Sequence, residues 1–102
     1  MPERLHKINW TGPALQDLLE IVDYIKIDNK KAAYHFAKDI KGKVSRLTIF
    51  PNSGRIVPEF PTSGLREIII GNFRIIYRVI SDKHTVEILT LRHGARLLEN
   101  EP

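Results

Sequence analysis

The side chains of this chain that could perform chemistry are mainly arginines. Arg74 lies within a long apolar run, and Arg92, His93 and Arg96 follow near the C-terminus. A guanidinium group binds phosphate through paired N–H donors, and an imidazole can gain or lose a proton near neutral pH. If these side chains gather on one surface, the chemistry that they favour is phosphate binding.

The elements that position Arg74 can be derived from a short turn. Gly71-Asn72 predicts a two-residue β-hairpin turn between strands at 65–70 and 73–80. In this register Ile70 pairs with Phe73, and successive side chains alternate between the two faces of the sheet. One face, which we expect to pack against helices, carries Ile68, Ile70, Phe73, Ile75, Tyr77 and Val79. The other face carries Glu67, Arg74 and Arg78 among isoleucines.

A third strand is predicted at residues 85–92, after a second turn. If the register continues from that turn, Arg78 lies opposite Glu87, and Arg74 lies opposite Leu91. One interpretation is an exposed sheet face with ordinary cross-strand ion pairs. The predicted pairing of Arg78 with Glu87 favours this interpretation.

Arg74 favours a second interpretation, because no acid lies directly opposite it. In the predicted register His93 is diagonally close to Arg74, and Arg92 and Arg96 are nearby. A cluster of unpaired cations suits phosphate binding better than it suits stability. We therefore predict a target-binding or phosphate-binding surface, to which we also assign Arg66.

The N-terminal half predicts a short edge strand followed by two helices. Residues 5–10 form the strand, Thr11 can cap the first helix, and Pro13 lies in its first turn. The first helix has an apolar stripe of Leu15, Leu18, Leu19, Val22 and Ile25. A second helix, over 30–49, has an apolar face of Ala33, Phe36, Ala37, Ile40, Val44 and Leu47. A short connection at Asp28-Asn29 predicts an antiparallel helical hairpin.

The predicted fold class is therefore α+β. An N-terminal strand, a two-helix hairpin and a three-stranded antiparallel meander follow one another, and the helices pack on one sheet face. Residues 51–64 contain three prolines and two glycines, which predicts an ordered surface loop. We expect a single domain over residues 1–102.

Composition excludes several classes of function. The chain has no cysteine, which excludes disulfides, zinc–thiolate sites and thiol nucleophiles. Its histidines are too dispersed for a metal site, at His6, His35, His84 and His93, so we expect no metal and no cofactor. No apolar run is long enough for a signal peptide or a membrane span. We therefore expect a cytoplasmic protein with no membrane partner.

The net charge of +4 is concentrated in residues 30–55. This stretch holds Lys30, Lys31, Lys38, Lys41, Lys43, Arg46 and Arg55 against one acid, Asp39. Four acids precede it, at Asp17, Glu20, Asp23 and Asp28. The pattern is consistent either with two solvated helix faces of opposite charge or with a basic surface for nucleic acid or an acidic partner.

Several short motifs together resemble the RelE/ParE superfamily of toxins, also described as plasmid stabilisation proteins, and are closest to its ParE-like members. They cover essentially the whole chain in the family's order. The helical half contributes Asp28-Asn29, Ala32-Ala33, Phe36, Phe50-Pro51 and Gly54-Arg55. The sheet contributes Gly64-Leu65-Arg66-Glu67, the segment 71–79, Val86-Glu87-Ile88-Leu89 and the closing Arg92-His93-Gly94-Ala95-Arg96.

This resemblance implies the toxin of a type II toxin–antitoxin system, neutralised by an antitoxin encoded beside it. A ParE-like member is implied to inhibit DNA gyrase and growth without a hydrolytic step, so the chain would not be an enzyme. Operator DNA would be contacted only indirectly, through the antitoxin. We expect the antitoxin to fold on binding and to mask arginines such as Arg74 and Arg96.

The alternative that the resemblance allows is a RelE-like or YoeB-like messenger RNA endoribonuclease, or mRNA interferase, that acts on the ribosome. Cleavage through the RNA 2′-hydroxyl needs a base, a cation and an acid. By position, the family's catalytic residues would be Glu59, Arg74 and His93. The loop 51–64 contains no lysine, and the C-terminal aromatic residue of some RelE-like enzymes is missing, which makes a RelE-type mechanism less favoured than a YoeB-type one.

Overall fold

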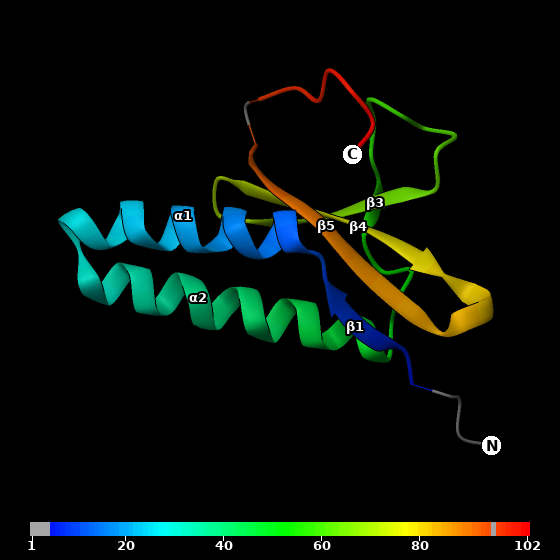
Figure 1. Ribbon diagram of the computed structural model, residues 1–102, viewed down its shortest axis with the longest axis horizontal. Helices are drawn as coiled ribbons and strands as arrows, with labels where there is room; N and C mark the ends of the chain where they lie inside the picture. The colour runs from blue at the N-terminus through cyan, green and yellow to red at the C-terminus, as the bar shows by residue number, and fades with distance from the viewer. Residues whose placement is uncertain (1–4, 95) are drawn as a thin grey trace.

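The structure, a computed structural model, describes residues 5–94 and 96–102. Two antiparallel helices cover one face of a five-stranded sheet, and the far end of the helical hairpin extends beyond the sheet (Figure 1). The helices are α1 (Gly12–Asp28) and α2 (Lys30–Ser45), and a 3₁₀ turn, η1, covers Arg46–Thr48. The strands are β1 (Lys7–Trp10), β2 (Arg55–Ile56), β3 (Leu65–Ile70), β4 (Phe73–Ile80) and β5 (Thr85–His93), with a second 3₁₀ turn, η2, at Ser81–Lys83.

The helix boundaries follow from local capping. The Thr11 side chain accepts a hydrogen bond from the Ala14 backbone N–H, and the Asn29 side chain does the same for Ala32. Both caps satisfy amide groups that have no partner within the helix, so the predicted cap at Thr11 is confirmed. The second helix is shorter than the predicted 30–49, because its last turn tightens into η1.

The apolar stripe predicted for α1 is partly wrong. Ala14 is fully buried, and Leu18 and Ile21 pack against the core. Leu15 and Leu19 are instead 46% and 59% exposed. The helix is rotated so that the small Ala14 side chain contacts the sheet, which leaves the two leucines on an open apolar face.

The β3–β4 hairpin has the register that its turn predicts. Ile70 pairs with Phe73, and Glu67 pairs with Ile76. Gly71 has a φ of 56°, a conformation that glycine adopts without strain. Five of the six predicted helix-facing side chains of the hairpin belong to the main core or pack against it. The sixth, Phe73, meets Phe36 of α2 edge-on, with ring centroids 5.2 Å apart.

The register predicted between β4 and β5 is correct only near the turn. Arg78 pairs with Glu87, but Leu89 has no partner, so a bulge shifts the rest of β5 by one residue. Arg74 therefore pairs with Arg92 instead of the predicted Leu91. Because a shift of one residue moves each side chain to the other face, Arg92 shares a face with Arg74.

Among the described residues the sheet has one strand more than predicted, β2, and the predicted N-terminal strand β1 lies at the opposite edge. The order is β1-β5-β4-β3-β2, so β1 is an edge strand, as predicted, and it pairs in parallel with β5. The segment 51–64 is not only a surface loop, because it contains β2 and the fully buried Val57. Where β1 ends, α1 continues along β5, and Asp17 accepts a hydrogen bond from the Leu91 backbone N–H at 3.1 Å.

The second face of the sheet is largely covered, although Ile69 on this face is 46% exposed, which corrects the expectation of an exposed face. Val57, Leu65, Ile76 and Leu98 form a second buried cluster, with Phe60 and Leu89 packed against it. The chain segment after β2 and the C-terminal tail therefore form an irregular layer that covers the sheet on the side opposite the helices (Figure 1). Within the described residues, neither helix is long and apolar enough to cross a bilayer.

Candidate functional site

Glu59 and Arg74, predicted to act together, meet beneath this irregular layer. The two Arg74 terminal nitrogens donate to the two Glu59 oxygens at 2.6 and 2.7 Å, a bidentate ion pair. Arg74 also donates to Glu67 through Nε at 2.8 Å and Nη2 at 2.6 Å. The Arg74 side chain is only 4% exposed, so it is enclosed between two carboxylates.

The network continues to the surface through Glu67. Its second oxygen forms an ion pair with Arg55, whose side chain is largely exposed. Two arginines and two glutamates thus alternate in the order Arg55, Glu67, Arg74, Glu59, and their formal charges cancel. Arg74 is therefore not the unpaired cation that its cross-strand neighbours indicated, which corrects that expectation.

The C-terminal tail is fastened to this network. The Leu98 backbone N–H donates to Glu59 at 3.0 Å, and the Arg96 carbonyl accepts from Arg74 at 3.3 Å. The Leu98 side chain is 7% exposed and fills the second cluster. One ion pair thus fixes both the tail and the segment that carries Glu59.

These hydrogen bonds determine the protonation of the pair. The bond from Arg74 is the main cause that lowers the pKa of Glu59 to about 2, and the bond from the Leu98 amide contributes. Hydrogen bonding to Glu59, and then to Glu67, raises the pKa of Arg74 above its ordinary value. Both groups are therefore charged at neutral pH, and the Glu59 carboxylate is a much weaker base than an ordinary glutamate.

His93 lies on the other face of the sheet from Glu59 and Arg74. It pairs with Phe73, and the two rings meet edge-on with centroids 5.5 Å apart. Since Phe73 packs against α2, this is the helix-covered face. The bulge in β5 has this effect, because the unshifted register would have placed His93 beside Arg74.

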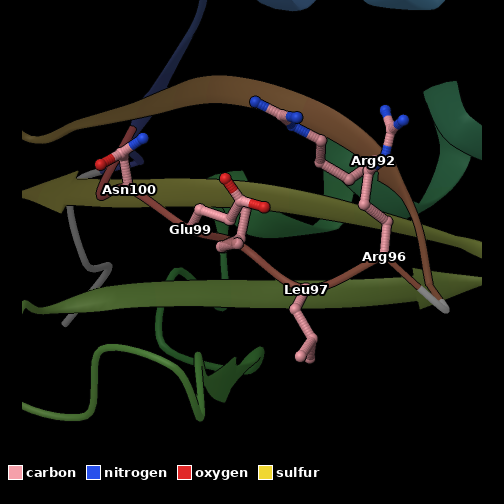
Figure 2. Close-up of a pocket in the computed structure, with 6 residues that line it drawn as sticks. Arg92, Arg96, Leu97, Glu99 and Asn100 are labelled. Atoms are coloured by element: carbon pink, nitrogen blue, oxygen red, sulfur yellow. The ribbon is translucent and has the colours of Figure 1, made fainter.

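The arginines assigned to a phosphate-binding surface divide into three groups. Arg66 donates to the Gly54 carbonyl at 2.8 Å and pairs with Tyr77, whose side chain is in the main core. Arg74 is used within the ion-pair network. Arg92 and Arg96 remain together, because both line one pocket between β5 and the tail (Figure 2).

The basic residues of α2 and η1 lie outside the ion-pair network, although Lys43 and Arg46 line a hollow beside Arg55 and Glu67. Lys30, Lys31, Lys38, Lys41, Lys43 and Arg46 are all exposed. No ion pair to any of them is present among residues 5–94 and 96–102, so direct ion pairs between the two helices do not account for them. Within the same ranges, no group of three or more histidines and acids could hold a metal ion.

Two members of the ion-pair network, Glu67 and Arg55, were not predicted as partners of Arg74. The hairpin register contained a signal for Glu67, because Arg74 pairs with Ile69 and Glu67 is two residues away on the same face. Diagonal neighbours in a sheet are within reach of long side chains. The position of Arg55 depends on β2, and a two-residue strand has too short a pattern to be recognised.

Comparisons with known proteins agree with this fold. The family model of the ParE toxin of the type II toxin–antitoxin system parDE matches residues 8–98. Toxin RelE2 of Caulobacter vibrioides is 34% identical over 91 residues, covering 89% of this chain and 98% of that protein. Putative toxin Y4kP of Sinorhizobium fredii is 36% identical over 90 residues, covering 86% and 88%.

A solved structure has the same architecture. In the chromosomal ParDE toxin–antitoxin system from P. aeruginosa, one chain superposes with a TM-score of 0.73 at 23% identity, covering 89% of this chain and 98% of that one. This chain therefore belongs to the ParE toxin family of type II toxin–antitoxin systems, within the RelE/ParE superfamily.

Proposed function

We propose that this toxin inhibits DNA gyrase in the manner implied by its ParE-like sequence, and that it does not cleave RNA. The observation that carries the proposal is the bidentate ion pair between Glu59 and Arg74. A general base works best with a pKa near the operating pH, whereas that of Glu59 is about 2. The cation that would stabilise a phosphorane is held by two carboxylates.

The position of His93 supports the same proposal. A base and an acid that act on one phosphodiester must both reach it, and Glu59 and His93 lie on opposite faces of the sheet. The proposed target is therefore bound by the toxin's surface, and no covalent step follows.

Two assays on one purified sample test this proposal. We expect wild type and His93→Ala to inhibit gyrase supercoiling alike and to leave a translated messenger RNA intact. Glu59→Gln, assayed at a temperature at which circular dichroism shows it folded, serves as the second variant. Message cleavage that disappears in both variants, with supercoiling unaffected, would instead establish the ribonuclease.

We also propose that a cognate antitoxin covers the apolar groove between β1, α1 and α2. The groove has a volume of about 390 Å³. Its apolar lining is Ile8, Trp10, Leu15, Leu18, Ala37, Ile40 and Val44. It adjoins the open edge of β1, so an amphipathic or extended segment could bury its side chains and pair its backbone there.

Leu15→Asp is expected to weaken antitoxin binding by about tenfold or more, because it places a charge in the apolar groove. Leu15 is 46% exposed, so the free toxin should keep its fold. Titration calorimetry with the antitoxin encoded beside the toxin measures the effect. Tyr24→Asp is the matched control, since Tyr24 is 74% exposed and does not line the groove. Equal affinity for both variants would contradict the proposed groove.

A further inference from the structure

We propose that Arg92 and Arg96 form a phosphate-binding site that contacts the backbone of duplex DNA. This inference rests on the proposed function and deepens it, because a gyrase inhibitor acts where an enzyme holds DNA. The two arginines border a pocket of about 320 Å³. The remaining lining comes from the tail, with Leu97, Leu98, Glu99 and Asn100.

The two arginines come from different elements and are brought together by the fold. Arg92 is on this face only because of the bulge at Leu89. After β5 the chain turns sharply, with the Gly94 N–H bonded to the Asn72 carbonyl at 2.6 Å. The returning tail then carries Arg96 beside Arg92, and Figure 2 shows both side chains on the same side of the tail.

The backbone that carries Arg96 is held in place before any ligand binds. Arg74 donates to the Arg96 carbonyl, and Glu59 accepts from the Leu98 N–H. Holding the backbone in advance reduces the conformational entropy lost on binding. In this proposal Glu59 and Arg74 are positioning residues. Their buried ion pair holds the tail backbone in place and takes no part in catalysis.

The charges near the pocket leave these two guanidinium groups available. In the described part of the chain, neither Arg92 nor Arg96 has a side-chain hydrogen bond or an ion pair. Glu99 lines the same pocket and opposes anion binding. Asp17 and Glu20 line an adjoining hollow that Arg92 and Arg96 also border, so these two acids face the same arginines. The Asp17 carboxylate already accepts hydrogen bonds from Thr90 and Leu91, and Glu20 accepts one from Gln16.

Phosphate suits this pair better than a single carboxylate does. Each guanidinium offers a planar set of donors that matches two oxygens, and a phosphodiester in a DNA backbone presents repeated, permanently charged groups. Within the described structure these are the two arginines of the predicted surface that remain unused by the fold.

Fluorescence anisotropy with a short labelled DNA duplex and the purified toxin tests the site. The double variant Arg92→Ala/Arg96→Ala is expected to bind at least tenfold more weakly. The slope of log K against log salt should fall by about two, one for each phosphate contact. Lys30→Ala/Lys31→Ala is the control, because it removes the same charge from exposed positions at the start of α2. Equal weakening in both double variants would overturn the site, as would stronger binding to single-stranded RNA or to an acidic peptide.

Two acidic residues make the test sharper. Glu99→Gln should tighten DNA binding roughly twofold to fivefold, because it removes the opposing charge from the pocket. Glu59→Gln also removes an acid, yet we expect it to weaken binding, because the tail loses its anchor. Tighter binding in folded Glu59→Gln would contradict the positioning role.

The DNA-binding measurement and the gyrase assay can fail independently of each other. DNA binding that depends on Arg92 and Arg96, without gyrase inhibition, would keep the site and reject the proposed target. Gyrase inhibition that is unchanged in the double variant would keep the target and reject the site.

Discussion

Arg74→Ala is expected to lower the free energy of unfolding by about 3 to 5 kcal/mol, the usual cost of removing one partner from a buried ion pair. The substitution leaves Glu67 fully buried with Arg55 as its remaining partner, and it leaves Glu59 without its main donors. A domain of this size has a total stability of about 5 to 15 kcal/mol, so the loss would be a large part of it. Urea unfolding followed by circular dichroism measures the change.

Arg78→Ala is the matched control for this prediction. Arg78 lies on the same strand and is 36% exposed, with its nearest acid, Glu101, 3.6 Å away. Exposed ion pairs contribute about 0 to 1 kcal/mol, so this variant should remain close to wild type. If the two variants were destabilised equally, burial of the network would not be the cause.

Stability should also fall steeply in acid because of Glu59. Its pKa is about 2 in the folded chain and 4.5 in its unperturbed state. The charged form is favoured by folding, so the contribution is fully present above pH 4.5 and is lost as the pH falls toward 2. At about 1.36 kcal/mol per pKa unit, this one group contributes at most about 3 kcal/mol.

Urea unfolding at a series of pH values between 6 and 2 measures this loss. Glu59→Gln should be less stable than wild type at pH 6, and the difference between the two should shrink as the pH falls. A difference that stays constant over this range would show that Glu59 is not stabilised in its charged form.

Local patterns in the sequence were sufficient for both helices, for four of the five strands and for one register, but not for β2 or for the end of α2. Thr11 and Asn29 define helix starts through their own side chains, and Gly71-Asn72 sets the pairing of β3 with β4. Such features depend on residues only a few positions apart. The prediction of an α+β fold and of the core face of the hairpin followed from them and is confirmed.

The candidate site depended on contacts that no local pattern contains. A bulge at Leu89 exchanged His93 for Arg92 on the face of Arg74, and this one-residue shift separated the predicted catalytic residues. The bulge places Leu91 in the main core and lets Leu89 pack against the second buried cluster. This arrangement depends on the packing of both layers against the sheet, which no local pattern encodes.

The sequence by itself therefore determined the helical hairpin, four of the strands and the prominence of arginines on one side of the sheet. Tertiary structure decided which of those arginines are neutralised. Arg74 is buried because segments on either side of it in the chain bring Glu59 and the tail over the sheet. The physical reason is that a buried cation requires paired charges, and those partners are selected by distance in space, whatever their separation along the chain.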